Sequence, residues 1–250
     1  MAARSKILYL FDVDGTLTKP RQIITEEFKK FLLQQVKPRA TLGLVSGSDY
    51  SKIVEQMGGE AATAQFEYVF CENGAVFYRD GVLRSSESIL SYVGEATLQR
   101  VINFALAYMS KIELPAKRGN FVEFRSSLIN LCPVGRSCSQ AERDEFSEFD
   151  KEHKIREKFV AALQSEFEDS KLMFALGGQI SVDVFPNGWD KTYCLNHVTS
   201  ESFEEIHFFG DKTFKGGNDY EIYSDDRTIG HRVTSPDDTK QQLIKLLSIE

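Results

Sequence analysis

The chain has 250 residues, 42% of them hydrophobic, which is enough to bury one large core or two modest cores. Its 30 basic and 37 acidic residues give a net charge of −7, which argues against nucleic acid or an anionic membrane as the main partner. No apolar run is long enough for a signal-peptide core or a membrane span, and the four cysteines have no zinc-site spacing, so we expect a soluble cytoplasmic protein with reduced thiols.

The first third of the chain alternates apolar segments with amphipathic ones. Strands are predicted at residues 6–11, 41–45 and 67–71, and helices at residues 25–36 and 49–57. Thr25 is placed to cap the first helix, because a threonine side chain accepts hydrogen bonds from the first turn. This order is typical of parallel α/β units. After it, Asp80-Gly81 indicates a hairpin between two short strands.

The middle of the chain has a different pattern. Helices at residues 95–112 and 152–167 accompany four short strands, at residues 121–125, 128–132, 171–176 and 179–185. From Gly188 the α/β alternation resumes, with strands at 205–210 and 228–233 and helices at 190–198, 217–222 and 237–249. We therefore predict an α/β fold: a parallel-sheet core in two parts, residues 1–81 and 188–250, with an α+β unit, residues 82–187, inserted between them.

Polar residues follow several of the predicted core strands. Asp12 and Asp14 come after the first strand, where positions i and i+2 point to the same side. Two carboxylates this close repel each other unless a cation lies between them, one is protonated, or both reach into water. Ligands of open α/β sheets bind beyond the carboxyl ends of the strands. The further candidates at that edge are Ser46, Gly47, Lys191, Asp211, Asn218 and Asp219.

Together these residues suit a magnesium ion shared with a phosphoryl group. Carboxylates suit a hard cation, whereas a lysine, the Ser46 hydroxyl and the Gly47 backbone N–H suit an anion. One aspartate would then attack phosphorus, and the other would move a proton to or from the leaving oxygen. A lone pair of aspartates after a strand is more often a solvated turn, so the prediction depends on the whole set in this order.

Six longer segments carry more specific information. They are FDVDGTLTKPRQ (11–22), CENGAV (71–76), KRGNFVEFR (117–125), GRSCSQAERDEF (135–146), GGQISVDVFPNGWDKTYCL (177–195) and FGDKTFKGGNDYEI (209–222). The segments resemble the eukaryotic phosphomannomutase family of the haloacid dehalogenase superfamily, along nearly the whole chain. The resemblance implies a haloacid dehalogenase-like core in which Asp12 is the phosphorylated nucleophile and Asp14 the general acid/base.

The same resemblance implies two cation sites. The residues implied around the catalytic Mg²⁺ are the ligands Asp12, Asp14 and Asp211, the catalytic Lys191, and the supporting Asn218 and Asp219. A second, structural cation would use Asp225 together with the carbonyl groups of Tyr223 and Thr228. The family usually has proline where this chain has Asp226.

The resemblance also makes the inserted unit a substrate-binding cap. The residues it implies in sugar-phosphate binding are Arg21, Arg125, Arg136, Arg143, Ser181 and Asp183. Independently, the alternation within residues 179–185 puts Ser181 and Asp183 on one face of a strand. The alternative for any single arginine is an ordinary surface charge, paired with Glu142, Asp144 or Glu145. Two arginines within the segment 135–146, beside hydroxylated side chains, favour a phosphate site instead.

The function implied is a Mg²⁺-dependent mutase that interconverts mannose 6-phosphate and mannose 1-phosphate. It would work through an aspartyl-phosphate, with a hexose 1,6-bisphosphate as activator, and feed GDP-mannose synthesis. The resemblance also implies a homodimer formed through the cap. A sugar-phosphate phosphatase of the same superfamily is the alternative, because both enzymes use the same core groups. A non-catalytic sugar-phosphate binder is disfavoured, because both aspartates are present.

Overall fold

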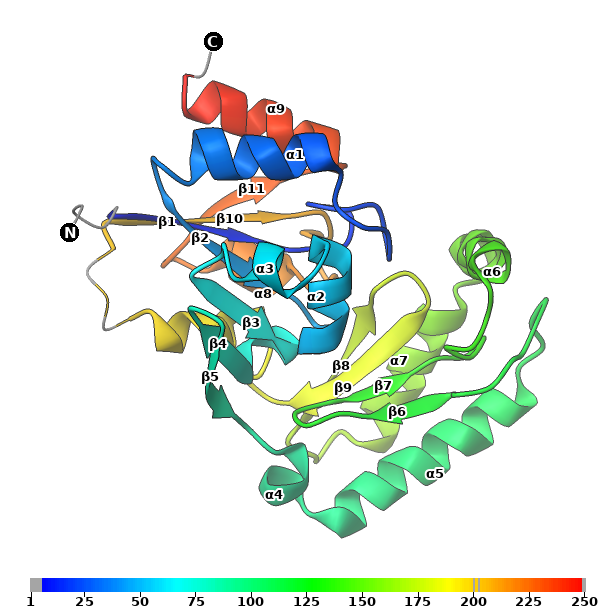
Figure 1. The fold of residues 1–250 in the computed structure, drawn as a ribbon. Coiled ribbons are helices and arrows are strands. Elements are labelled where there is room, and N and C mark those ends of the chain that lie inside the picture. Colours follow the sequence, from blue (N-terminus) through cyan, green and yellow to red (C-terminus); the bar gives the residue numbers. More distant parts are fainter. Residues whose placement is uncertain (1–5, 200, 202, 249–250) are drawn as a thin grey trace. The chain divides into compact units, whose positions relative to one another are not determined.

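The structure is a computed structural model that describes residues 6–199, 201 and 203–248 (Figure 1). The chain forms two compact units. The core unit joins the residues up to Ser86 with those from Gly188 onward, and the insert runs from Glu87 to Asn187. The chain thus leaves the core unit once and returns to it.

The core unit is built on a seven-stranded sheet in the order β11-β10-β1-β2-β3-β4-β5. Its strands are β1 (Ile7–Phe11), β2 (Thr41–Val45), β3 (Tyr68–Cys71), β4 (Val76–Arg79), β5 (Val82–Ser86), β10 (Glu205–Gly210) and β11 (Ile229–Arg232). From β11 to β3 neighbouring strands pair in parallel, whereas β4 and β5 pair antiparallel. Because β10, β1 and β2 are parallel neighbours, their carboxyl ends meet at one edge of the sheet.

The first boundary of the insert differs from the predicted one. Residues 82–86, predicted to open the insert, form β5, which pairs with β4 and belongs to the core unit. The Asp80-Gly81 hairpin was predicted, but its second strand was assigned to the wrong unit. Four β5 residues are exposed, because β5 is the edge strand of the sheet. An exposed strand has no buried face to mark it as part of a core.

Both faces of the core sheet are covered, which explains its continuous apolar strands. Along β1, Tyr9 and Phe11 pack in one hydrophobic cluster and Leu8 and Leu10 in another. The first cluster is closed by α1 (Glu26–Phe31), the π-helical turn η1 (Leu32–Val36), α2 (Tyr50–Met57) and α9 (Pro236–Leu246). The second is closed by the 3₁₀ helix η3 (Lys191–His197) and α8 (Tyr220–Ser224). Strands buried on both faces are typical of parallel sheets.

Polar side chains fix where the core helices begin. Thr25 accepts a hydrogen bond from the backbone N–H of Phe28, so the predicted cap of α1 is confirmed. Asp49 caps α2 in the same way, and Gly58 ends it with a left-handed φ of 85°. The short helix α3 (Glu60–Thr63) follows at once. The caps of α2 fix where this helix begins and ends, and so which of its residues face the loop after β1.

The insert contains a four-stranded antiparallel sheet in the order β6-β7-β9-β8. Its elements are α4 (Ile89–Val93), α5 (Glu95–Lys111), β6 (Val122–Phe124), β7 (Ile129–Leu131), α6 (Gln140–His153), α7 (Ile155–Glu166), β8 (Leu172–Gly177) and β9 (Ser181–Pro186). The apolar sides of α5 and α7 pack with the apolar residues of β7, β8 and β9 in one cluster. Val182 and Val184 of β9 lie in that cluster, so Ser181 and Asp183 point to the opposite face.

Two helices of the insert, α4 and α6, have no counterpart among the predicted elements, and α6 holds one of the candidate arginines. Ser139 and Glu142 form a reciprocal capping box at the start of α6, and Arg143 lies in its first turn. The sequence pattern indicated only a phosphate-binding segment here. The helix is rich in charge and buries few side chains, so it lacks the apolar stripe by which a helix is usually recognised. The Ser-x-x-Glu spacing was the available signal.

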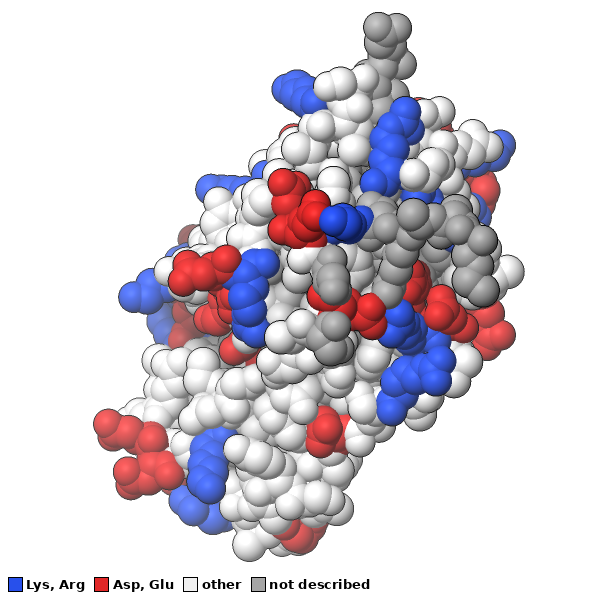
Figure 2. Space-filling view, turned by 90° about the vertical axis from the view of Figure 1, so that its left-hand side faces the viewer, with Lys and Arg blue, Asp and Glu red and all other residues white. Residues whose placement is uncertain are grey.

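Charges of both signs are interspersed on the face of the protein drawn in Figure 2. Among the charged residues of the protein, Lys151 and Glu148 form an exposed ion pair, and such pairs contribute little to stability. All four cysteines are buried and free, as predicted. Within the described ranges, no helix has the length and apolar character needed to cross a membrane.

Candidate active site

Asp12 lies where β1 ends, against the neighbouring strand β10. Its backbone N–H donates to the carbonyl oxygen of Phe209 at 2.9 Å, and its side chain is buried. The chain then turns back on itself, with the N–H of Gly15 donating to the carbonyl of Thr18 at 2.7 Å. Gly15 has φ 87°, and a Cβ at this position would lie 2.4 Å from an oxygen of Asp211. Glycine is therefore required both by the turn and by the approach of Asp211.

Lys191 holds the Asp12 carboxylate from the first turn of η3. Its Nζ donates to Oδ1 of Asp12 at 2.5 Å and to Oδ1 of Asp219 at 2.6 Å. Lys191 and Asp219 are completely buried. The second oxygen of Asp219 accepts from the backbone N–H of Lys212 at 2.9 Å. Lys191 thus binds one oxygen of Asp12 and one oxygen of Asp219 at the same time.

The charges of this cluster do not balance. Burial raises the pKa of Asp12 to about 8; Lys191 opposes this rise, whereas Asp219 and Asp211 add to it. Burial also raises the pKa of Asp211, again with a contribution from Asp219. Burial alone would lower the pKa of Lys191. The negative charges of Asp12 and Asp219 together raise this pKa by more than burial lowers it, so the ammonium keeps its proton. The charge of Lys212 opposes the rise at Asp211, so the three carboxylates lie near two ammonium groups.

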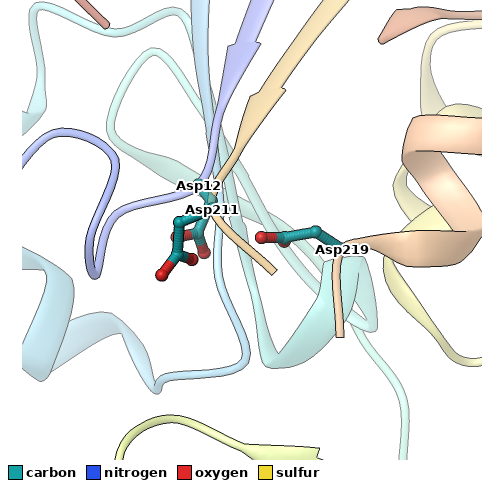
Figure 3. Close-up of side chains that lie close together, drawn as sticks. All are labelled: Asp12, Asp211 and Asp219. Carbon is teal, nitrogen blue, oxygen red and sulfur yellow. The ribbon is translucent and has the colours of Figure 1, made fainter. Parts of the chain in front are cut away.

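Asp12, Asp211 and Asp219 are close enough to share a cation. Each offers an oxygen within 4.8 Å of the other two, and Asp219 points toward the other two side chains (Figure 3). Oxygen ligands and excess negative charge fit Mg²⁺, which usually takes one or two carboxylates directly and keeps several waters. Since Asp219 is already bound to two donors, Asp12 and Asp211 are the carboxylates left to bind the ion directly.

The carboxylate of Asp14 is engaged elsewhere. Its Oδ1 accepts the backbone N–H of Arg21 and the side-chain Nε2 of Gln56, both at 2.8 Å. Asp14 is half-buried, whereas the predicted substrate residue Arg21 is exposed and has a left-handed φ of 60°. Gln56 was not singled out from the sequence. A glutamine near the end of a helix carries no spacing signal, and only the fold brings it to Asp14.

Ser46 directly follows the adjacent strand β2 at the same edge of the sheet. Its backbone N–H donates to the carbonyl of Phe70 at 2.9 Å, and its Oγ accepts from the N–H of Ser48 at 3.1 Å. Gly47 lies between the two serines. Asn218 is half-buried and directly precedes Asp219. Ser46, Gly47, Asp211, Asn218 and Asp219 therefore lie at the carboxyl edge or in the chain that follows it, whereas Lys191 reaches Asp12 from η3, which follows the insert.

At the predicted second cation site, the carboxylate of Asp225 is paired with the guanidinium of Arg227. Asp225 accepts hydrogen bonds from the backbone N–H, Nε and Nη2 of Arg227, at 2.9, 2.8 and 2.7 Å. These bonds, led by the side-chain one, lower the pKa of Asp225. Thr228 donates its hydroxyl to the carbonyl of Ile222 at 2.5 Å. Tyr223 lies in α8 just before Asp225, so a cation bound here would compete with Arg227 for the carboxylate.

In the insert, two candidate arginines share one carboxylate. Arg125 donates its Nε to Oε1 of Glu123 at 2.7 Å, and Arg136 pairs with Oε2 of the same residue. Arg136 also donates to Oδ1 of Asn130 at 2.8 Å. Asn130 in turn donates to Oδ1 of Asp183 at 2.5 Å. The acidic partner of both arginines is therefore Glu123, on β6, and not one of the residues on α6 suggested as the alternative.

The other insert candidates lie around this network. Ser181 and Asp183 are buried on β9, and Arg143 is buried on α6. Glu142, one of the suggested acidic partners, instead binds Arg118 and caps α6. The polar face of the insert sheet therefore carries a connected chain of charged and amide side chains, which sequence reasoning found only in part.

Comparison with known proteins identifies the family. The profile described as "Eukaryotic phosphomannomutase" matches residues 28–249. The chain is 53% identical to "Phosphomannomutase" of Drosophila melanogaster over 98% of this chain and 97% of that protein. It is 54% identical to "Phosphomannomutase 1" of Mus musculus, over 97% and 93% of the two chains.

A solved structure with a similar fold supports the architecture. The IMP-bound IMP-nucleotidase of Plasmodium falciparum has a TM-score of 0.68 and 15% identity, over 98% of this chain and 69% of that one. At this identity the likeness concerns the fold alone, which is haloacid dehalogenase-like, with an α+β unit inserted in its core. The family profile and the relatives at 53% and 54% identity show that the chain belongs to the eukaryotic phosphomannomutase family.

Proposed function

We propose that the protein is a Mg²⁺-dependent phosphomannomutase, which interconverts mannose 6-phosphate and mannose 1-phosphate. The observation that carries the proposal is the identity of 53% to a protein named phosphomannomutase along 98% of the chain. The core geometry supports it, because a buried aspartate is held by a lysine beside two further carboxylates. This is the arrangement that a phosphorylated nucleophile and its cation require.

In the proposed reaction, Asp12 exchanges a phosphoryl group with the sugar. Oδ2 of Asp12 attacks phosphorus of a hexose 1,6-bisphosphate; the new O–P bond forms while the P–O bond to the sugar breaks, and Asp14 gives a proton to the leaving sugar oxygen. In the reverse direction, Asp14 takes the proton from a sugar hydroxyl as that oxygen attacks phosphorus. Mannose 6-phosphate thus becomes the bisphosphate, which returns its other phosphoryl group to Asp12 and leaves as mannose 1-phosphate.

The remaining core residues hold the reacting groups. Lys191 fixes the carboxylate of Asp12, and Ser46 with the N–H of Gly47 offers donors to the phosphoryl oxygens. Asp12 and Asp211 would bind Mg²⁺, which shields the negative charge of a phosphoryl group as it meets Asp12. Asp219 holds Lys191 in place.

The proposal extends to location and assembly. We expect a cytoplasmic protein, since four free cysteines suit a reducing compartment. We expect a homodimer formed through the insert, from the family resemblance, and a role in supplying mannose 1-phosphate for GDP-mannose synthesis. Size-exclusion chromatography with light scattering checks the dimer, and a monomer at micromolar concentration would contradict it.

The function is tested by following two products at once. Mannose 1-phosphate is supplied with Mg²⁺ and a trace of hexose 1,6-bisphosphate, and mannose 6-phosphate and free phosphate are both measured. A mutase gives mainly mannose 6-phosphate and depends on the bisphosphate. Release of phosphate without isomerisation would instead identify a sugar-phosphate phosphatase.

Metal removal should abolish turnover. With excess chelator the cluster of Asp12, Asp211 and Asp219 keeps its unbalanced charge, and we expect activity to fall to background. Added Mg²⁺ should restore it, and Ca²⁺ should restore it poorly, because Ca²⁺ prefers more ligands and longer bonds. Full activity in the presence of the chelator would exclude a metal role for these residues.

Substitution of Asp14 should affect sugar substrates selectively. In Asp14→Asn, turnover of mannose phosphates should fall by about 10²- to 10⁴-fold, the contribution of a general acid/base. An acyl phosphate should still phosphorylate Asp12 at close to the normal rate, because its leaving group needs no proton. Equal losses on both donors would show that Asp14 is not the acid/base.

The insert arginines should bind the second phosphate of the sugar bisphosphate. In Arg136→Ala or Arg143→Ala, binding of sugar phosphates should weaken by about 1.5 to 3 kcal/mol for each charged hydrogen bond that the substitution removes. The residual activity should shift toward hydrolysis, whereas a small acyl phosphate should react normally. Arg118→Ala is the matched control, since Arg118 lies in the same unit, half exposed and paired with Glu142. An unchanged ratio of mutase to hydrolase activity would contradict this role.

A further inference from the structure

Gln56 connects α2 to the loop that carries Asp14. Its side chain is buried, with an exposed fraction of 1%, and lies in the last turn of the helix. Nε2 donates to Oδ1 of Asp14 at 2.8 Å and approaches Oγ1 of Thr18 at 3.3 Å. The backbone carbonyl of Gln56 accepts from the N–H of Ile24 at 2.7 Å. Both its main chain and its side chain therefore brace the loop between β1 and α1.

The orientation of the amide follows from chemistry. An ionised carboxylate only accepts hydrogen bonds, so the nitrogen of the Gln56 amide must face Asp14. The amide oxygen is buried and has no hydrogen-bond partner among the described residues. Burying an amide with one half unsatisfied costs free energy, and an apolar side chain of the same size would avoid that cost. A purely structural role does not account for a glutamine here.

Two donors converge on the same oxygen of Asp14. The Gln56 amide and the Arg21 backbone N–H both bind Oδ1, each at 2.8 Å. A proton on Oδ1 would compete with the N–H donors for the same side of that oxygen. If the carboxyl group carries its proton on the other oxygen, Oδ1 is a carbonyl oxygen and can still accept from the N–H donors. Oδ1 therefore serves as the acceptor whether or not Asp14 carries a proton.

We propose that Gln56 is a positioning residue for Asp14, which holds Oδ1 so that the other oxygen, Oδ2, carries the proton exchanged with the sugar. The inference rests on the proposed function, in which Asp14 is the acid/base. As the P–O bond to the sugar breaks and its electron pair stays on the sugar oxygen, the proton passes from Oδ2 to that oxygen. In the reverse direction Oδ2 takes the proton from the attacking hydroxyl. The carboxylate needs no rotation between the two half-reactions.

The test compares Gln56→Met with the unchanged protein on two kinds of donor. Methionine keeps the volume of the side chain and removes the N–H donor. We expect kcat for mannose 1-phosphate to fall by about 10- to 100-fold, part of the contribution of a general acid/base, with little change in KM. Phosphorylation of Asp12 by an acyl phosphate, which needs no proton, should stay within about twofold. Gln56→Asn, which withdraws the amide by one methylene, should give the same selective loss.

A double-mutant cycle separates positioning from packing. In an Asp14→Asn background, Gln56→Met should cause almost no further loss, because there is no carboxylate left to position. Gln65→Met, at an exposed glutamine just after α3, is the matched control and should leave both donors unaffected. Equal losses on both donors, or losses that multiply with those of Asp14→Asn, would show that Gln56 only supports the fold.

Failure of the Gln56 proposal can be distinguished from failure of the proposed function. If the unchanged protein releases phosphate from mannose 1-phosphate without isomerising it, the mutase proposal fails. The role of Gln56 is then measured on released phosphate, since hydrolysis of a sugar phosphate needs the same proton. If Asp14→Asn itself shows no selectivity between donors, the role of Gln56 fails together with the acid/base role of Asp14, while the mutase proposal is still decided by the isomerised sugar.

Discussion

Asp12→Asn should lose turnover of mannose phosphates by about 10⁴-fold or more, because no neighbouring group can replace a missing nucleophile. Asparagine has the same shape, and Lys191 keeps Asp219 as a partner, so the variant should fold. Mass spectrometry should find no phosphoryl group on this variant after incubation with an acyl phosphate, whereas the unchanged protein gains one.

The matched control for this substitution is Asp80→Asn. Asp80 is exposed in the turn between β4 and β5 and has a left-handed φ of 52°, a conformation that asparagine tolerates well. Its activity should be normal. Retention of native activity by Asp12→Asn would remove Asp12 from the role of nucleophile and leave the cluster without a covalent mechanism.

Lys191→Met should destabilise the protein as well as inactivate it. Lys191 is the ammonium between two buried carboxylates, and its removal leaves Asp12 and Asp219 facing each other without compensation. Breaking a buried ion pair by removing one partner typically costs about 3 to 5 kcal/mol. Urea unfolding of the metal-free protein measures the loss, since bound Mg²⁺ would offset part of it.

Two further variants test the electrostatic origin of this loss. Lys191→Met combined with Asp219→Asn should recover part of the stability, because one of the two uncompensated charges is gone. Lys158→Met, at an exposed lysine of α7, should change the free energy of unfolding by less than about 0.5 kcal/mol. If Lys191→Met is as stable as Lys158→Met, the carboxyl groups of Asp12 and Asp219 must be protonated in the folded protein.

Much of the core site was accessible from the sequence, because parallel strands bring their carboxyl ends to one edge. Asp12, Ser46 and Asp211 each follow an apolar run that could only be a buried strand. Asp219 was found in the chain that follows β10 at the same edge, and Lys191 just after the insert, at the start of η3. Their mutual bond, however, joins residues 28 positions apart through a fold that no local pattern describes.

The residues that were missed share one property: they act through another side chain. Gln56 reaches Asp14 across 42 positions of sequence, and Asn130 reaches Asp183 across 53. Glu123 pairs with Arg125, two residues along the chain, but its second partner, Arg136, lies beyond the next strand. Hydrophobic periodicity reports burial and not polar partners, so these interactions required the folded structure.

The position of β1 in the middle of the core sheet has a consequence for synthesis of the protein on the ribosome. Leu8 pairs with Thr41 on one side and with Ile206 on the other, so the second partner emerges long after the first. The insert is continuous in sequence and can complete its own sheet earlier. Until β10 arrives, β1 has an unpaired edge, which is a hazard for aggregation. Lys191 also emerges long after Asp12, so the Asp12 carboxylate lacks its ammonium partner until then.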